Sequence, residues 1–131
     1  EARNRVTPYE EVVDALSRLR GRYFLVSVTN GNSQIRHTPL HASFDLSLTA
    51  AEVGAAKPDP AIFHAASRMS GIPLAGFLHV GDDPERDVRA GRDLGLPTVW
   101  VNRGRQAWPL PLDPPDLEVA DLTELVGILV G

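Results

Sequence analysis

Residues 77–95 read FLHVGDDPERDVRAGRDLG, and the fold class can be predicted from their pattern. Phe77 to Val80 is a short apolar run, which predicts a strand buried within a sheet. Gly81-Asp82-Asp83 interrupts that run with turn-forming and acidic residues. Pro84 to Leu94 then has the pattern of a helix, with Asp83 suited to cap its first turn. The segment therefore predicts a strand, an acidic turn and a helix in succession.

The same alternation continues outward from this segment in both directions. Further strands are predicted at residues 23–29, 44–48, 97–101 and 117–120, and helices at residues 8–19, 60–69 and 121–130. Short apolar strands that alternate with helices of about ten residues indicate a parallel sheet with helices on both faces. The sequence therefore predicts an α/β fold with a Rossmann-like parallel sheet. Its 131 residues are enough for one domain but not for two.

The composition narrows the classes of partner. The net charge of −4 gives no reason to expect nucleic-acid binding. No apolar run approaches the roughly 20 residues that span a bilayer. The chain has no cysteine, which excludes disulfides, thiolate nucleophiles and cysteine-ligated zinc and is compatible with a reducing cytoplasm. We therefore expect a cytoplasmic globular domain with neither a nucleic-acid nor a membrane partner.

Three polar clusters lie at strand ends or in the loops beside them. They are Thr29-Asn30-Gly31, Lys57-Pro58-Asp59 and Gly81-Asp82-Asp83. Ligands of open parallel sheets bind beyond the carboxyl ends of the strands, so we expect the clusters to converge there. The Thr29 hydroxyl and the backbone N–H groups after it can hold a phosphate oxygen. The simpler interpretation of that cluster alone is a turn that needs asparagine and glycine.

Lys57 is the only lysine in the chain, since the other twelve of its 13 basic residues are arginine. An ammonium is a compact point charge, unlike the planar guanidinium of arginine. The following Pro58 holds Lys57 in an extended backbone. From there its ammonium can neutralise a phosphoryl oxygen and a nearby carboxylate. The alternative is a solvated surface lysine, which is the usual environment of this residue type.

The acidic residues after the strand at 77–80 indicate a magnesium site. Carboxylates at such a position cost free energy unless they are paired or bind metal. Mg²⁺ takes one or two protein carboxylates and keeps several waters, so Asp82 and Asp83 are candidate ligands. Asp87 lies one helical turn past Asp83 and can face the same site. The alternative for Asp83 is that it only caps the helix. His79 is predicted to be a packed or hydrogen-bonded strand residue.

The motifs TNGN (29–32), EVG (52–54), KPDPAIF (57–63) and HVGDDPERDVRAG (79–91) follow one another in this order. Together they resemble the haloacid dehalogenase-like hydrolase superfamily, in particular its phosphatase branch with a small helical cap inserted early in the chain. The resemblance runs from about residue 8 to the C-terminus. The combination of motifs is specific, whereas each motif alone is weak.

The resemblance implies roles for the residues of the three clusters. Thr29 is the hydroxyl that binds the transferred phosphoryl group, helped by the backbone of Asn30-Gly31. Lys57 steadies the nucleophile and the phosphate. Asp87 orients Lys57 or a metal-bound water. The residues that the resemblance assigns to Mg²⁺ binding are Asp82 and, as an additional ligand, Asp83.

The first motif of the family, Asp-x-Asp-x-Thr, is not found where the resemblance requires it. Its first Asp is the nucleophile that forms an aspartyl-phosphate. It should precede Thr29 by far more than the 28 residues present, and none of these fits. Residues 45–49 (DLSLT) mimic the motif but follow Thr29, so we reject Asp45 as nucleophile. The resemblance places the missing strand mid-sheet, between the strands that end at Thr29 and Asp82. We therefore expect residues 1–131 to be the C-terminal part of a catalytic core, with the nucleophile on a preceding segment or a second chain.

Several functions stay open at this point. The first is a Mg²⁺-dependent phosphomonoesterase of small phosphorylated metabolites. The second is a haloacid dehalogenase, which needs no metal and leaves the acidic cluster poorly explained. The third is a non-catalytic fragment that serves as a binding or assembly module. A receiver-like domain would carry its acidic pair after the first strand, whereas here the pair comes late.

Overall fold

The computed structural model describes residues 8–30 and 42–130 of the chain. The elements in chain order are α1 (Pro8–Leu19), β1 (Val26–Thr29), β2 (Leu46–Thr49), α2 (Ala50–Val53), α3 (Ala61–Ser70), η4 (Leu74–Gly76), β3 (His79–Gly81), η5 (Pro84–Arg89), α4 (Ala90–Asp93), β4 (Thr98–Val101), β5 (Leu117–Val119) and α5 (Leu122–Leu129). The longest of these helices, α1, has 12 residues. Within the described ranges, no helix has both the length and the apolar character required to cross a bilayer.

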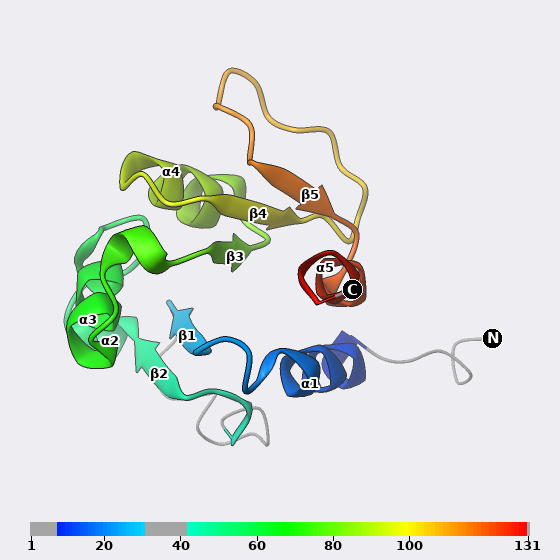
Figure 1. Ribbon diagram of the computed structural model, residues 1–131. Coiled ribbons are helices and arrows are strands. Elements are labelled where there is room, and N and C mark those ends of the chain that lie inside the picture. The colour runs from blue at the N-terminus through cyan, green and yellow to red at the C-terminus, as the bar shows by residue number, and fades with distance from the viewer. Residues whose placement is uncertain (1–7, 31–41, 131) are drawn as a thin grey trace.

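The strands form two parallel sheets. β1 pairs with β2, which places Thr29 opposite Thr49. In the second sheet β4 lies between β3 and β5, and Gly81 at the end of β3 lies opposite Trp100. Figure 1 draws β1 on the side of its sheet that faces β3, although no β-ladder joins these two strands in the described part of the chain. The alternation of parallel strands with helices confirms the predicted α/β fold.

Helices lie on opposite faces of the three-stranded sheet, as the alternation of side chains along β4 shows. Val99 and Val101 pack with Leu125 of α5. Thr98 points the other way, since a Cβ added to Gly91 of α4 would lie 2.8 Å from its methyl carbon. Successive side chains of a strand alternate between the two faces of a sheet, so α4 and α5 cover opposite faces. The helices therefore enclose this sheet as predicted (Figure 1).

A buried carboxylate joins α1 to the half of the molecule that holds β3, β4 and β5. Glu11 of α1 is only 9% exposed. It accepts hydrogen bonds from both terminal nitrogens of Arg103, which follows β4, and from the backbone N–H of Leu122 at 2.5 Å. Leu122 begins α5, so Glu11 also satisfies one of the free N–H groups of that helix. Ala15 and Leu19 of α1 and Val126 of α5 form an apolar cluster beside this contact.

The helix α2 was not predicted, although the sequence carries its signal. Thr49 accepts a hydrogen bond from the Glu52 backbone N–H at 3.2 Å, and Glu52 accepts one from the Thr49 backbone at 3.1 Å. This reciprocal pair is a capping box, for which Thr-x-x-Glu is the sequence signature. Gly54 ends the helix with a φ of 94°, a backbone conformation that favours glycine.

The predicted helix at residues 84–94 begins with a π turn. The backbone N–H of Val88 donates to the Asp83 carbonyl at 3.3 Å, five residues back, and Asp87 donates to the same carbonyl at 3.0 Å. The π turn, η5, continues directly into α4. Single π turns inside α-helices are frequent at functional sites.

Other boundaries differ from the prediction by a few residues. The strand predicted at 23–29 is shorter in the structure, since its hydrogen-bonded ladder begins at Val26. Tyr23 and Phe24 precede the strand and are 44% and 47% exposed. The helix predicted from Pro60 begins at Ala61, with Pro60 in the cap position. The Asp59 carboxylate accepts a hydrogen bond from the Ala61 backbone N–H at 2.9 Å, although Pro60 and not Asp59 is the cap residue.

Candidate active site

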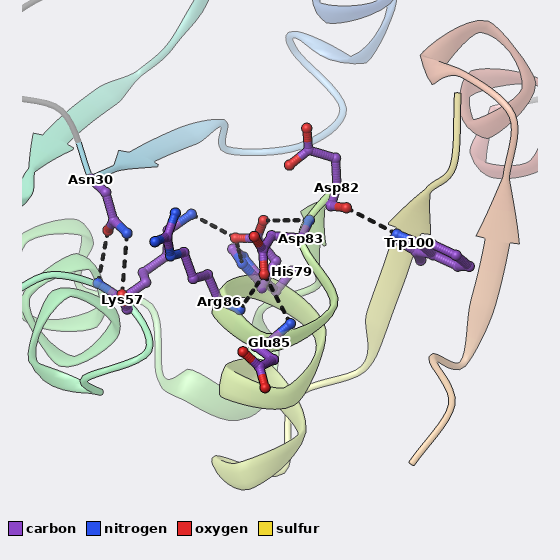
Figure 2. A network of polar contacts seen from close by, with 9 residues as sticks. Asn30, Lys57, His79, Asp82, Asp83, Glu85, Arg86 and Trp100 are labelled. Atoms are coloured by element: carbon purple, nitrogen blue, oxygen red, sulfur yellow. Dashed lines mark hydrogen bonds and ion pairs between the residues drawn. The ribbon is translucent and has the colours of Figure 1, made fainter. Parts of the chain in front are cut away.

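The side chain of Asn30 holds the backbone of Lys57. Asn30 is the first residue after β1, and its carboxamide oxygen accepts a hydrogen bond from the Lys57 N–H at 2.8 Å. Its amide nitrogen donates to the Lys57 carbonyl at 3.1 Å. Two hydrogen bonds in opposite directions define both the position and the orientation of one peptide segment. The loop that carries Lys57 is thereby attached to the carboxyl end of β1 (Figure 2).

The ammonium of Lys57 points at a buried carboxylate. Lys57 Nζ lies 2.6 Å from Asp87 Oδ1, and the side chains of Lys57 and Asp87 are 12% and 7% exposed. His79 Nε2 lies 3.1 Å from the same oxygen. The second oxygen, Oδ2, accepts a hydrogen bond from the Asp83 backbone N–H at 3.2 Å. Asp87 is therefore held by three donors from three parts of the chain.

These contacts determine the charge of Asp87. Burial by itself raises the pKa of this carboxyl group. The hydrogen bond with His79, together with the charge and hydrogen bond of Lys57, outweighs burial and lowers the pKa from 3.8 to about 2. Asp87 is therefore a carboxylate at neutral pH, and it forms an ion pair with Lys57.

This lowered pKa predicts acid sensitivity. A carboxyl group whose pKa is lowered by folding stabilises the folded state above its unfolded pKa of 3.8, and the stabilisation is lost as the pH falls toward about 2. The difference in pKa corresponds to about 2 kcal/mol. We expect the free energy of unfolding in urea to fall more steeply between pH 5 and pH 3 in the native sequence than in Asp87→Asn. The exposed Asp113→Asn serves as control and should keep the native slope; equal slopes in all three proteins would contradict the ion pair.

Gly81 is required for the close approach of Asp87. A Cβ added to Gly81 would lie 2.2 Å from Asp87 Cγ and 2.3 Å from Oδ2. Non-bonded atoms do not approach a Cβ atom so closely in real proteins, so any side chain at position 81 would displace the Asp87 carboxylate. This packing, rather than backbone conformation, explains the glycine at the end of β3.

Replacing Gly81 with alanine should therefore disrupt the site. We expect Gly81→Ala to lower the free energy of unfolding by about 1–3 kcal/mol, the usual cost of overpacking. Gly127 of α5 provides a matched control, because an added Cβ there meets nothing within 4 Å. Gly127→Ala should leave stability unchanged or raise it by up to about 1 kcal/mol. Urea denaturation of both variants measures the difference, and a Gly81→Ala protein as stable as the Gly127 variant would contradict the packing argument.

The carboxylates of Asp82 and Asp83 differ in their hydrogen bonds. Asp83 Oδ1 accepts hydrogen bonds from the backbone N–H groups of Glu85 and Arg86 at 2.9 and 2.8 Å, so Asp83 caps η5. The exposed carboxylate of Asp82 has no partner among the described residues and points away from η5 (Figure 2). The buried Trp100 fixes its backbone, because the indole N–H donates to the Asp82 carbonyl at 3.0 Å.

This arrangement fits Mg²⁺ better than a metal that needs a protein cage. The described residues contain no group of three or more His, Asp or Glu side chains placed to hold a metal ion. Mg²⁺ is commonly bound by one or two carboxylates and completes its shell with waters and substrate oxygens. Asp82 is available for such a role, whereas Oδ1 of Asp83 is already occupied by two backbone donors.

Thr29 and Asp45 lie at opposite ends of the β1–β2 sheet. Thr29 is the last residue of β1 and adjoins Asn30, so it is at the same edge as Lys57. Asp45 precedes β2; it accepts a hydrogen bond from the Leu25 N–H at 2.7 Å and pairs with Arg20 at 3.0 Å. Its position far from the carboxyl ends agrees with its rejection as nucleophile. Gly31, the remaining predicted phosphate-binding residue, lies outside the described residues.

Two contacts of the site were missed by sequence reasoning. The predicted role of Asn30 concerned its backbone, whereas its side chain binds Lys57. The prediction that His79 is packed or hydrogen-bonded is confirmed, but its partner Asp87 was not identified. Asn30 and Lys57 are 27 residues apart in the chain, and His79 and Asp87 belong to different elements, β3 and η5, so neither contact follows from a local sequence pattern.

Known proteins similar to this chain include phosphatases and dehalogenases. The phosphoserine phosphatase of Thermus thermophilus is 37% identical over 132 residues, which cover 94% of this chain and 51% of that protein. The 2-haloacid dehalogenase from Pseudomonas syringae pv. Tomato DC3000 superposes with a TM-score of 0.86 at 33% identity, covering 93% of this chain and 53% of that one. The putative HAD-hydrolase YfnB from Bacillus subtilis, whose structure is bound to magnesium, gives a TM-score of 0.79 at 29% identity, covering 88% and 53%.

The chain spans about half the length of the curated relatives that it matches. The family model described as haloacid dehalogenase-like hydrolase matches residues 1–95, which include the clusters at Thr29, Lys57 and Asp82. The predicted resemblance is thereby confirmed, and the chain belongs to the haloacid dehalogenase-like hydrolase family.

Proposed function

We propose that this chain supplies the phosphate-binding and metal-binding part of a Mg²⁺-dependent phosphomonoesterase. The observation that carries the proposal is the 2.6 Å contact between the Lys57 ammonium and the buried Asp87 carboxylate. An ammonium has three N–H donors, and Asp87 uses one of them. In the part of the chain that the structure describes, no other group binds Lys57 Nζ, so the remaining donors can bind a phosphoryl oxygen and the nucleophile. Neither hydrophobic packing nor surface solvation explains why a lysine is held in this way.

In the proposed reaction, the nucleophile is an aspartate from a segment outside these 131 residues. Its carboxylate attacks phosphorus, and the P–O bond to the alcohol breaks, so that the alcohol leaves with the electron pair and takes up a proton from water. A water molecule then attacks the aspartyl-phosphate and breaks the bond between the carboxylate and phosphorus, which releases inorganic phosphate and a proton and restores the aspartate. The Thr29 hydroxyl and the backbone N–H groups of Asn30-Gly31 donate to the phosphoryl oxygens, and Lys57 offsets their charge. Mg²⁺ held by Asp82, with Asp83 as an additional ligand, would offset further negative charge on the phosphoryl group.

The sheet topology supports a place for that outside segment. β1 and β3 are edge strands of two separate parallel sheets, and Figure 1 draws them facing one another. A parallel strand between them would join the sheets through its backbone hydrogen bonds and would end at the same edge as Thr29 and Gly81. An aspartate at its carboxyl end would then lie beside Lys57. The segment can belong to the same polypeptide or to a second chain.

The proposed substrate is a small phosphorylated metabolite. Relatives about 30–37% identical are named as phosphatases of phosphoserine, of pyrimidine nucleotides, of a phosphoribityl-aminouracil and of glyceraldehyde 3-phosphate. These compounds share a phosphate monoester and little else. The likeness to these proteins therefore supports a phosphate monoester as the substrate class and does not select one compound among them.

A haloacid dehalogenase is the second candidate, because (S)-2-haloacid dehalogenases are among the similar proteins at 30% identity. The exposed Asp82 carboxylate favours the phosphatase, because it could bind Mg²⁺, whereas a dehalogenase reaction needs no metal and does not account for this residue. A non-catalytic binding module is the third candidate, and it gives no reason for an ammonium buried against Asp87.

One set of assays separates the three candidates. The full-length protein should hydrolyse 4-nitrophenyl phosphate in the presence of Mg²⁺, and EDTA should abolish the hydrolysis until Mg²⁺ is restored. Chloride release from (S)-2-chloropropionate, unaffected by EDTA, would instead identify a dehalogenase. Absence of both activities in a folded full-length protein would favour the binding module and overturn the proposal.

A further inference from the structure

The ring of His79 is fixed in one orientation beneath the site. His79 begins β3, and its side chain is 10% exposed. The ring of Phe63, from α3, packs against it edge to face, with 4.8 Å between centroids and an interplanar angle of 87°. On the other side, a Cβ added to Gly91 would lie 3.5 Å from His79 Cβ and 3.7 Å from its ring. Such packing leaves an imidazole little freedom to rotate.

The fixed ring donates a hydrogen bond to Asp87. Nε2 lies 3.1 Å from Asp87 Oδ1. Oδ1 is already paired with the Lys57 ammonium at 2.6 Å, so it belongs to a carboxylate that can only accept. Nε2 must therefore carry the proton, and a neutral imidazole with its proton on this nitrogen is sufficient.

We propose that His79 is a positioning residue, whose Nε2–H holds the Asp87 carboxylate in the orientation that receives Lys57 and so places the Lys57 ammonium for the phosphoryl group. The inference rests on the proposed function and deepens it. His79 touches neither the substrate nor the phosphoryl group. It acts on the reaction through Asp87 and Lys57 in turn.

The distribution of donors around Asp87 explains why this contact matters. Among residues 8–30 and 42–130, the Asp83 N–H is the one donor to Oδ2, whereas Oδ1 receives both His79 and Lys57. Lys57 reaches Oδ1 on a flexible four-carbon stem, which by itself does not prevent rotation of the carboxylate. The ring of His79 comes from a buried strand and is rigid. It is therefore the donor that sets the orientation of the Asp87 carboxylate. The flexible side chain of Lys57 then binds Oδ1 where that orientation places it.

Kinetics of the full-length protein test the role of the N–H group. His79→Phe keeps an aromatic ring against Phe63 but removes the donor, whereas the carboxamide of His79→Gln can place an N–H near the position of Nε2. We expect His79→Phe to lower kcat for 4-nitrophenyl phosphate by about 10- to 100-fold with little change in KM, as for residues that orient a catalytic group. His79→Gln should restore most of kcat. The exposed neighbour His64→Phe serves as control and should be unchanged.

A spectroscopic measurement tests the same role without using activity. In protein labelled with ¹⁵N-lysine, the side-chain signal of Lys57 is the one lost in Lys57→Arg. We expect the Lys57 ammonium to exchange its protons slowly in the native protein and in His79→Gln, because Asp87 holds it. In His79→Phe the exchange should be as fast as that of solvated lysines. Unchanged exchange and unchanged kcat in His79→Phe would show that His79 only fills space and would overturn the proposal.

A second pair of variants covers the case in which His79→Phe fails to fold. His79→Asn and His79→Gln both carry an amide, but the shorter asparagine cannot reach Asp87 Oδ1. We expect slow Lys57 exchange and high kcat in the Gln variant alone, and equal behaviour of the two would overturn the proposal. If the native protein hydrolyses no phosphate ester, the proposed function fails, whereas the exchange measurement still decides whether His79 positions Lys57.

Discussion

Replacing Lys57 with methionine is expected to lower kcat for 4-nitrophenyl phosphate by about 100- to 1,000-fold, the usual cost of removing one donor to a developing charge. Methionine keeps most of the length and apolar volume of the stem and removes only the charge and its N–H groups. Asp87 is then left buried with its negative charge unpaired, apart from the hydrogen bonds of His79 and Asp83. Removal of one partner of a buried ion pair costs about 3–5 kcal/mol, so the free energy of unfolding should fall as well.

Two further substitutions distinguish loss of the Lys57 ammonium from a general loss of positive charge. Lys57→Arg keeps the charge, but a planar guanidinium does not fit a 2.6 Å contact built for a compact ammonium, so activity should stay low. The exposed Arg68→Met on α3 removes a positive charge outside the site and should behave as the native protein does. Circular dichroism confirms that each variant is folded before kcat is compared. A Lys57→Met protein that is folded and fully active would remove Lys57 from the proposed reaction.

Replacing Asp82 with asparagine is expected to abolish the dependence on Mg²⁺ together with most of the activity. Stabilisation of phosphoryl charge by a metal ion contributes several kcal/mol, which corresponds to a fall in kcat of roughly 100- to 1,000-fold. Mg²⁺ binding to the full-length protein can be followed independently of activity by calorimetry. It can also be followed through Trp100, whose indole N–H is bonded to the Asp82 carbonyl. Binding should be lost in Asp82→Asn and retained in the native protein.

Asp83 provides the matched control for Asp82. Serine also caps helices well, so Asp83→Ser keeps the hydrogen bonds to Glu85 and Arg86 while removing the carboxylate. We expect Asp83→Ser to retain Mg²⁺ binding and most of kcat if Asp82 is the principal ligand. Loss of Mg²⁺ binding in Asp83→Ser with retention in Asp82→Asn would reverse the assignment of the two residues.

Local patterns in the sequence were sufficient to predict the α/β fold, most of its helices and strands, and the candidate residues of the site. Residues 77–95 show why: an apolar run, an acidic turn and a helix with its cap are local patterns, and each depends on neighbours within about one turn or one strand. The capping box at Thr49 and Glu52 is equally local and was available to the same reasoning. The π turn could not be predicted in this way. Its hydrogen bond from the Val88 N–H to the Asp83 carbonyl forms in a segment that packs on β3 and β4.

The contacts among these candidate residues depend on the tertiary structure. Lys57 meets Asp87 across 30 residues of chain, and Asn30 meets Lys57 across 27. Such contacts form because parallel strands bring their carboxyl ends to one edge of the sheet, and the sequence predicts that edge without predicting which donor meets which acceptor. The partners are chosen by side-chain packing: Gly81 leaves room for the Asp87 carboxylate, and Phe63 holds the ring of His79. Packing acts between residues far apart in the chain, and no local pattern of residue types records it.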